Sequence, residues 1–468
     1  LEDTEKRFLA SVRPLLTDEE YAQTERIARA FFAPSGEGAE LHRRLLERAK
    51  EKSDSSWILD WWNEFAYLRV RCPTVVNVSY FYQFAPTRTQ FSGDACGYAA
   101  AVVTVMEQFR RLLLAEKLPP EMEGSGDRAR PLCMRMYRYL FNACRQPRPD
   151  MDSYVVHDGS KHHHLAVLRK NKLYTFSLYH DAQATRPLST YEIRAQLQRV
   201  VEDAGGERDP SVGAMTMHDR DIWAKDFARL VGDPTNRKAI DAIERATMMV
   251  CLDDISPETV DEMGRLLFHS NGRDRWYDKT LQLVVTDNGR AGFIGEHAMS
   301  DGMPTARMCH SVLHLLESGR VDHGRPFDAV PSCLPVPERL RWSLDGPMLA
   351  SVLTAEQALL ELAYQHDLRT LQFGEYGKEA IKKLRTSPDA WCQLAIQLAY
   401  FRTHGRVVGT YEAAHTRRFL HGRTATVRSC SIESTQWVHA MCDPSVPAAE
   451  RVRLLQEAAS AHSKRARE

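Results

Sequence analysis

The sequence predicts an α/β (α+β) fold in which mixed sheets are covered by helices. Two pairs of apolar, β-branched runs joined by polar turns predict hairpins at 164–180 and 280–297. Amphipathic stretches of helical period follow each hairpin, at 191–206 and 301–318. Strands that alternate with helices in this way are typical of layered α/β proteins.

The first quarter of the chain predicts mostly helix. Apolar residues recur at helical spacing over 4–32 and 41–70, on either side of a glycine-containing break. A β-branched and aromatic run at 74–82 predicts a strand. A long helix is expected over 95–117, because Pro119-Pro120 follows it and proline cannot continue a helix.

The first hairpin and the elements after it fill the middle of the chain. The turn of the hairpin at 164–180 is predicted at Lys170-Asn171-Lys172. The helix at 191–206 has glycine at its end, as helices commonly do. The apolar run at 248–254 predicts a short buried strand.

The second hairpin leads directly into a helix. Asp287-Asn288-Gly289 between two apolar runs is a strong hairpin signal. Asp301 is a suitable cap for the helix at 301–318, and Pro304 falls in its first turn. A proline-rich stretch near 322–340 predicts a crossing between domains. The remainder is predicted to be helical apart from a short strand at 406–412.

Composition excludes several classes of protein. The 468 residues include 62 basic and 62 acidic side chains, which argues against a broad nucleic-acid or polybasic membrane surface. The 10 cysteines have no paired spacing, so reduced thiols in an intracellular compartment are expected. No apolar run is long enough to predict a transmembrane helix. The chain starts at Leu1, so it gives no information about a targeting presequence.

His297 is the first candidate for chemistry. It closes the second predicted strand of "GFIGEHAMSDGMPT", beside an acid and before a tight turn into a helix. Side chains at such a strand end project into clefts, and imidazole can take a proton near neutral pH. The alternative is a hydrogen-bonded structural histidine, and the residue alone does not decide between them.

A basic block forms the second candidate. Lys378, Lys382 and Lys383 precede Ser387-Pro388-Asp389, which opens a new helix. Ammonium groups beside a helix start suit a ligand that carries phosphate. The alternative is a solvated basic helix face. No phosphate-loop or dinucleotide glycine motif is present, so a nucleoside triphosphate or NAD site has no support.

Two further polar stretches need an interpretation. The segment 410–434 combines Tyr411, Thr424 and several arginines, which are more polar side chains than packing alone requires. On its own, this segment does not indicate a particular function. The run "KHHHL" at 161–165 suggests a metal, but consecutive strand residues point to alternate faces. No cysteine or acid stands at ligand spacing with these histidines, so no metal is expected.

Taken together, these blocks resemble the choline/carnitine acyltransferase family. The resemblance also includes "PLCM" at 131–134, "YRYLFNACRQP" at 137–147 and "NGRDRWYDKTLQLVV" at 271–285, and extends over nearly the whole chain. Within the family, "GFIGEHAMSDGMPTARM" looks most similar to carnitine acetyltransferases of the fungal type.

The resemblance implies roles for the candidate residues. His297 matches the general base, which deprotonates the carnitine hydroxyl or the coenzyme A thiol without an acyl-enzyme. Asp301 matches an acid that supports the site electrostatically, with helix capping as an equal alternative.

The resemblance also implies how the two substrates bind. Lys378 and Lys382, with Lys383 beside them, match the loop for the 3′-phosphate of coenzyme A. Ser387 and Asp389 match the "SPD" motif near the nucleotide or pantetheine arm. Tyr411 and Thr424 match positions that contact the carnitine carboxylate.

The fold that this family implies has two similar chloramphenicol-acetyltransferase-like domains with an active-site tunnel between them. Residues 1–68 would join 336–468 in the second domain, and 69–335 would form the domain of the catalytic histidine. Family members continue beyond the point that matches Glu468, so the second domain is expected to be incomplete. The missing part would include a Ser-Thr-Ser segment that helps bind carnitine and stabilises the oxyanion.

Three functions remain open from the sequence. The first is a carnitine O-acyltransferase of the acetyl type that uses coenzyme A. The second is a relative with another alcohol acceptor or a carrier-protein-bound acyl donor. The third is a truncated, non-catalytic coenzyme A-binding protein. A monomer without nucleic-acid partners is expected, in mitochondria or peroxisomes by family and otherwise in the cytoplasm.

Overall fold

The computed structural model describes residues 1–124, 126–327, 330, 334 and 336–467, and it divides into two compact units. The first unit combines Leu1–Leu59 with Leu371–Glu468, and the second is Asp60–Thr370. The second unit carries the larger sheet and the histidine of the "GEH" sequence.

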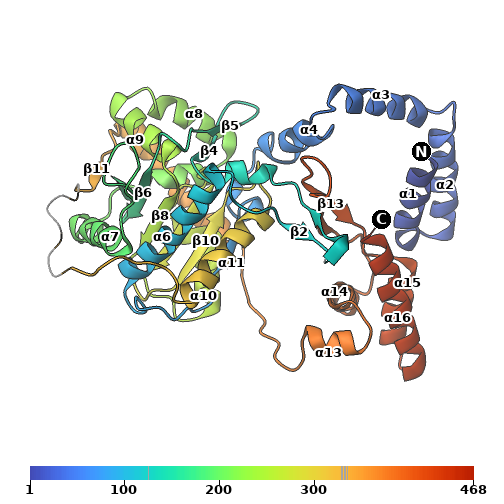
Figure 1. Ribbon diagram of the computed structural model, residues 1–468. Helices are drawn as coiled ribbons and strands as arrows, with labels where there is room; N and C mark the ends of the chain where they lie inside the picture. The colour runs from blue at the N-terminus through green and yellow to red at the C-terminus, as the bar shows by residue number, and fades with distance from the viewer. Residues whose placement is uncertain (125, 328–329, 331–333, 335, 468) are drawn as a thin grey trace. The chain divides into compact units, whose positions relative to one another are not determined.

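A seven-stranded mixed sheet forms the centre of the second unit (Figure 1). Its strands lie in the order β1-β10-β9-β8-β6-β7-β11. The pairs β6–β8 and β8–β9 are parallel and the others are antiparallel. The structure therefore confirms the predicted mixed α/β class. The strands are β1 (Tyr80–Gln83), β6 (His164–Arg169), β7 (Lys172–Ser177), β8 (Met249–Asp253), β9 (Leu281–Thr286), β10 (Ala291–Gly295) and β11 (Glu338–Leu340).

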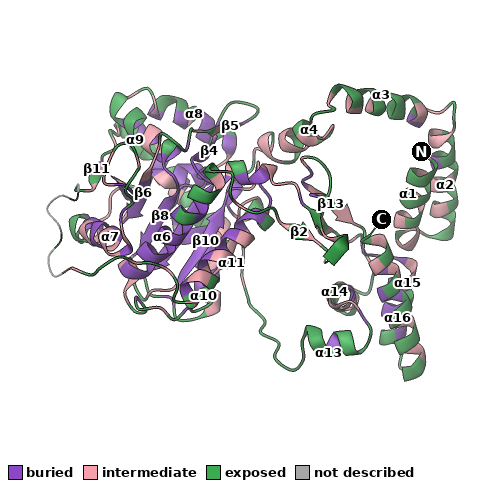
Figure 2. Cartoon of the chain, in the orientation of Figure 1, coloured by how far each residue is buried: buried purple, intermediate pink, exposed green. Residues whose placement is uncertain are grey.

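Helices cover both faces of this sheet because both faces are apolar. Along β6, Leu165 and Val167 join one buried cluster while Ala166 and Leu168 join the other, as the period of two requires. Figure 2 shows the strands mostly in the colour of buried residues. The first cluster includes α6 (Ala95–Leu114), α7 (Thr190–Ala204) and α11 (Gly302–Glu317); the second includes α8 (Arg220–Leu230), α9 (Pro234–Arg245), α10 (Val260–His269) and α12 (Gly346–Tyr364).

Both predicted hairpins are confirmed. The β6–β7 turn places Lys170 and Asn171 at φ 54° and 63°, which is the conformation that a two-residue hairpin turn requires. The β9–β10 turn contains Gly289 at φ 78°, a conformation that glycine adopts without steric cost. The second hairpin matters most for the site, because β10 leads to His297.

Two strand predictions were wrong in part or in full. Of the run 74–82, only β1 is a strand, whereas Thr74–Asn77 forms the distorted helical turn α5. Of the strand predicted at 406–412, only Glu412 lies in a strand. The chain instead pairs β12 (Glu412–His415) with β13 (Thr424–Val427), since a strand forms where it finds a hydrogen-bonding partner and not only where β-branched residues occur.

The two long N-terminal helices are interrupted. Pro14 lies in a 3₁₀ turn, Arg13–Leu15, because proline lacks the N–H that would continue the helix. The segments on either side are α1 (Glu2–Val12) and α2 (Asp18–Phe32). The second predicted helix becomes α3 (Glu37–Glu51), α4 (Leu59–Asn63) and a π-helical turn, η2 (Glu64–Leu68).

The first unit is mostly helical and has a small core of its own. Its buried residues are Ala390, Leu394, Trp437, Val438, Ala458 and Ala459. They come from α14 (Pro388–His404), α15 (Ile432–Cys442) and α16 (Ala448–Arg465), and the short α13 (Lys378–Lys383) precedes them. The minor elements of the second unit are β2 (Met122–Glu123), η3 (Gly126–Arg128), β3 (Arg130–Pro131), η4 (Arg135–Tyr139), β4 (Ala143–Gln146), β5 (Ser153–Val156), η5 (Val212–Met217) and η6 (Ser270–Gly272).

The division into units differs from the boundaries expected at 68/69 and 335/336. The buried residues of α12, such as Val352 and Leu359, belong to the second cluster of the central sheet, which keeps this helix in the second unit. The proline-rich stretch 322–340 falls partly on residues outside those described. Among the described helices, none is long and apolar enough to cross a membrane.

Candidate active site

His297 lies two residues after the end of β10, at the turn that leads into α11. Its side chain is 26% exposed, whereas its neighbours Glu296 and Ala298 are buried. Strand β10 pairs with β1 on one side and β9 on the other. The imidazole is therefore presented from the central sheet with its backbone fixed on one side and its ring partly open to solvent.

Two tyrosine rings flank this imidazole. Tyr67 stacks on it with ring centroids 5.0 Å apart and an interplanar angle of 21°. Tyr80 meets it edge-on at 5.1 Å and 81°. The Tyr80 hydroxyl is 2.9 Å from Thr305 Oγ1, and burial raises the pKa of the Tyr80 phenol well above its ordinary value, although the hydrogen bond with Thr305 opposes this. Tyr80 thus stays neutral across the pH range in which an imidazole titrates.

Asp301 places a carboxylate close to the ring. Its Oδ1 is 3.8 Å from His297 Nδ1, which is an electrostatic distance and too long for a hydrogen bond. Asp301 holds the N-cap position of α11, yet its side chain makes no capping hydrogen bond to the helix. The predicted pair is brought together, and the carboxylate faces the imidazole instead of the helix end.

Glu296 holds the turn that carries the histidine. Its carboxylate is fully buried and accepts the backbone N–H of Ala298 at 3.0 and 3.1 Å. Burial raises the pKa of Glu296, and the guanidinium group of Arg145 acts in the opposite direction. This buried acid clamps the two peptide units around His297.

Glycine is required at two positions because tyrosines approach the backbone closely. A Cβ on Gly295 would lie 2.4 Å from Tyr80 Cζ, and one on Gly302 would lie 2.6 Å from the Tyr82 hydroxyl oxygen. That hydroxyl donates to the Gly302 carbonyl at 2.7 Å. Gly295 therefore allows the Tyr80 ring to pack beside His297, and Gly302 allows Tyr82 to pack against Tyr80.

The predicted phosphate-binding residues lie in the first unit. Lys378, Lys382 and Lys383 are exposed on α13, and Lys382 Nζ is 3.1 Å from Glu379. Ser387 caps α14 by accepting the Ala390 N–H at 3.4 Å. The lysines therefore stand in solvent immediately before a capped helix start.

Asp389 belongs to a cluster that the sequence did not predict. His462, which is 4% exposed, has its Nε2 2.8 Å from Glu412 and 3.9 Å from Asp389. The three ligand atoms lie within 4.8 Å of one another, so this group has the donor set of a divalent metal such as zinc. The His462 imidazole already has Glu412 as a hydrogen-bond partner. The expectation that this protein binds no metal stays a prediction.

The two predicted carnitine contacts differ in their surroundings. Tyr411 is 64% exposed and precedes β12 directly. Thr424 begins β13, and its hydroxyl donates to the Ala414 carbonyl at 3.0 Å. The Thr424 donor is thus engaged within the hairpin, while its oxygen keeps accepting capacity.

The three consecutive histidines do not share one strand, because β6 begins at His164. His163 Nδ1 is 3.1 Å from Arg110 of α6, whereas His164 Nε2 is 2.8 Å from the Ala242 carbonyl of α9. Burial lowers the pKa of His164 from 6.5 to about 4. Protein groups thus engage His163 and His164, and the absence of a metal at this run stays a prediction.

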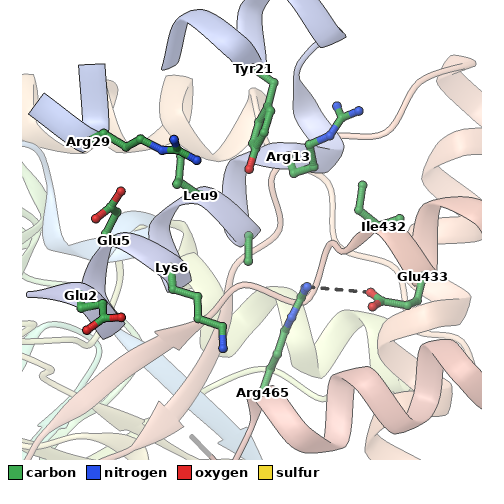
Figure 3. A pocket seen from close by; sticks show the side chains of 11 residues that line it. Glu2, Glu5, Lys6, Leu9, Arg13, Tyr21, Arg29, Ile432, Glu433 and Arg465 are labelled. Carbon is green, nitrogen blue, oxygen red and sulfur yellow. Dashed lines mark ion pairs between the residues drawn. The ribbon is translucent and has the colours of Figure 1, made fainter. Parts of the chain in front are cut away.

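A cavity of about 540 Å³ opens within the first unit, between α1, α2, α15 and α16 (Figure 3). Acids and bases line it together, and Arg465 and Glu433 form an ion pair at 3.8 Å there. None of the predicted site residues lines it.

The structure brings His297 and Asp301 together in one unit and places the other predicted residues in the other unit. Sequence reasoning missed Tyr67 and Tyr80 as neighbours of His297. The aromatic run 80–82 was a signal for β1, but only the pairing of β1 with β10 brings it to the histidine.

Comparisons with known proteins identify a family. The family model described as Choline/Carnitine o-acyltransferase matches residues 1–468. The chain is 32% identical to the carnitine O-acetyltransferase of Mus musculus over 467 residues, which are 97% of this chain and 72% of that protein. It is 32% identical to the choline O-acetyltransferase of Homo sapiens (99% and 63% covered) and 33% identical to the peroxisomal carnitine O-octanoyltransferase of Rattus norvegicus (100% and 77% covered).

Proposed function

Because the chain belongs to the choline/carnitine O-acyltransferase family, we propose that it transfers an acyl group between coenzyme A and the hydroxyl of carnitine, with His297 as general base. The chain is an acyltransferase of the coenzyme A-dependent kind. The observation that carries the base assignment is the partly exposed His297 imidazole at the end of β10, 3.8 Å from the Asp301 carboxylate.

The proposed reaction is a single displacement. His297 Nε2 accepts the proton of the carnitine hydroxyl while that oxygen attacks the thioester carbonyl. The new C–O ester bond forms, the C–S bond breaks, and the imidazolium returns its proton to the coenzyme A thiolate. A positioned base of this kind contributes about 10²–10⁴-fold to a rate. The reverse reaction uses the same proton path.

Asp301 stabilises the imidazolium that forms during transfer. At 3.8 Å its negative charge favours the protonated ring without taking the proton itself. The stacked Tyr67 ring and the edge of Tyr80 restrict the imidazole to one orientation. These contacts support a base whose geometry is set before substrate arrives.

The remaining site residues are proposed for substrate binding. Exposed lysines before the capped start of α14 suit the 3′-phosphate of coenzyme A, with Lys378 and Lys382 as the main contacts. Ser387 and Asp389 would face the nucleotide or pantetheine arm. Tyr411 has an exposed side chain whose hydroxyl is suited to the carnitine carboxylate, and Thr424 accompanies it in the segment of the β12–β13 hairpin.

The acyl group and the acceptor are tested by a thiol-release assay. Acetyl-, octanoyl- and palmitoyl-coenzyme A are each offered with L-carnitine or choline, because relatives carry each of these kinds of name. We propose the acetyl–carnitine pair as the preferred one. Preference for choline or for a longer acyl chain would replace that part of the proposal. We further propose an organellar location, which the peroxisomal relative supports.

Two matched pairs of variants test the residues. His297→Ala is expected to lower kcat by about 10²-fold or more, whereas His310→Ala, an exposed histidine on α11, leaves it unchanged. Lys378→Ala is expected to raise KM for the coenzyme A ester but not for carnitine, and the exposed Lys117→Ala is its control. An active His297→Ala enzyme would refute the base assignment.

A further inference from the structure

We propose that Arg145 is a positioning residue for the reaction, because its buried guanidinium group holds both the segment whose ring stacks on His297 and the backbone that carries His297. This inference rests on the proposed function of His297. Arg145 lies on β4, and its side chain is 0% exposed. It has no surface that a substrate could reach, so its effect must pass through its partners.

The first partner is the backbone of Tyr67. Arg145 Nη2 donates to the Tyr67 carbonyl at 2.9 Å. Tyr67 lies in the π-helical turn η2, where the regular backbone hydrogen bonding of a helix changes, and its ring stacks on His297. The Arg145 hydrogen bond therefore fixes the segment that places an aromatic ring against one face of the imidazole.

The second partner is the carboxylate of Glu296. Arg145 Nη1 donates to Glu296 Oε1 at 3.3 Å, and that same oxygen accepts the Ala298 N–H at 3.0 Å. Glu296 and Ala298 are the two residues on either side of His297. Through Glu296, Arg145 fixes the backbone from which the imidazole projects.

A third contact orients the guanidinium group itself. Arg145 Nε donates to Asp152 Oδ2 at 2.7 Å. Burial acts to raise the pKa of Asp152, but the guanidinium groups of Arg220 and Arg145 outweigh it, so this pKa lies below its ordinary value. Asp152 therefore stays charged, and the planar fork of Arg145 is locked by three acceptors. A lysine ammonium has no such planar fork.

Arg220 provides a natural comparison within the same network. Its side chain is also 0% exposed, and its Nε donates to the same Asp152 oxygen at 2.7 Å. Its other ionic partner is Asp278, at 2.8 Å. No hydrogen bond between Arg220 and Tyr67 or Glu296 is present among the described residues. Loss of Arg220 thus removes a buried ion pair without removing either connection to His297.

The experiment compares Arg145→Met, Glu296→Gln and Arg220→Met in the full chain. Glu296→Gln is nearly isosteric and keeps an acceptor for Ala298, so it breaks only the charge pair with Arg145. Melting temperatures measure the structural cost of each variant. Steady-state kinetics with the best acyl-coenzyme A and acceptor pair give kcat and both KM values.

We expect Arg145→Met and Glu296→Gln to lower kcat about 10- to 100-fold with little change in either KM. Arg220→Met should lose thermal stability as Arg145→Met does and keep kcat within about threefold of wild type. Arg145→Lys should recover only part of kcat. If Arg220→Met and Arg145→Met lose kcat in parallel, or if Glu296→Gln is fully active, the positioning role is wrong. If Arg145→Met does not fold, the comparison of kcat between Glu296→Gln and Arg220→Met decides whether the positioning role is right.

A second readout separates this inference from the proposed function. With ¹⁵N-labelled histidine, the titration of His297 is followed by NMR after assignment with His297→Gln. Arg145→Met and Glu296→Gln should shift the His297 midpoint or broaden its signals, while Arg220→Met should not. That result holds even if no acyl transfer is found. Unchanged His297 signals in both variants would refute the positioning role, and inactivity of wild type would refute only the proposed function.

Discussion

Replacing Gly295 by alanine should impair catalysis more than stability. The new Cβ would lie 2.4 Å from Cζ and 2.7 Å from Cε2 and the hydroxyl oxygen of Tyr80. Carbon atoms in contact are normally about 3.5–4.0 Å apart, so the ring must move by about 1 Å. Because the Tyr80 ring is held by Thr305 and packs edge-on against His297, its displacement disturbs the imidazole that we propose as the base.

The size of the effect follows from this displacement. Overpacking a buried site costs about 1–3 kcal/mol of stability. A misplacement of about 1 Å near the reacting groups can cost about 10²-fold in rate. We therefore expect kcat to fall about 10- to 100-fold, which corresponds to about 1.4–2.7 kcal/mol of activation free energy. The KM for the coenzyme A ester should change little, since its proposed contacts lie elsewhere in the chain.

The assay is thiol release together with thermal unfolding of the same preparations. Gly292→Ala is the matched control on the same strand, because its Cβ would meet Leu267 at 2.5 Å and the Tyr82 carbonyl at 2.8 Å but not Tyr80. It should lose comparable stability and keep most of its kcat. Gly206→Ala, with nothing within 4 Å, should change neither quantity.

If Gly295→Ala retains wild-type kcat while its stability falls, Tyr80 has no influence on the proposed base His297, and the prediction is wrong. It also fails if Gly292→Ala loses kcat to the same extent, since general disturbance of β10 would explain both variants.

Three further outcomes concern stability. Burial lowers the pKa of His164 from 6.5 to about 4, so below pH 6.5 the unfolded chain binds more protons than the folded chain. Between pH 6.5 and 4 the free energy of unfolding of wild type should therefore fall by up to about 3 kcal/mol more than that of His164→Gln. Burial lowers the pKa of Lys279 from 10.5 to about 8, so urea unfolding should show wild type gaining up to about 3 kcal/mol relative to Lys279→Met as pH rises from 8 to 10.5; parallel curves would contradict this. Ser189 and Glu192 form a capping box at α7, and Ser189→Ala should destabilise by about 1 kcal/mol in the same assay, with no change in kcat.

Local signals predicted the part of the fold that local chemistry decides. The turn Asp287-Asn288-Gly289 specified the β9–β10 hairpin because few residues accept the conformation that it needs. The same hairpin placed His297 at a strand end. Asp301 was expected beside it only from the resemblance to the family, and the two side chains lie 3.8 Å apart.

The contacts that hold His297 in place could not be predicted, because they join residues far apart in the sequence. Arg145 is 151 residues from Glu296 in the sequence, and Tyr67 is 78 residues from Arg145. Such contacts exist only after the sheet has assembled. The strand expected at 406–412 failed for a related reason, since pairing with 424–427 decided where β12 begins. The β-propensity of the residues indicated a strand in this region but did not indicate the strand with which it pairs.

The position of β10 in the sheet has a consequence for motion. Only β1, a strand of four residues at the edge, separates the strand that carries His297 from the sheet boundary. Edge elements open with free energies well below that of global unfolding, and amide hydrogen exchange detects such opening. Opening of β1 therefore removes one neighbour of β10 and also Tyr80, whose ring packs against His297. The orientation of His297, the proposed base, thus depends on an edge strand as well as on the central strands.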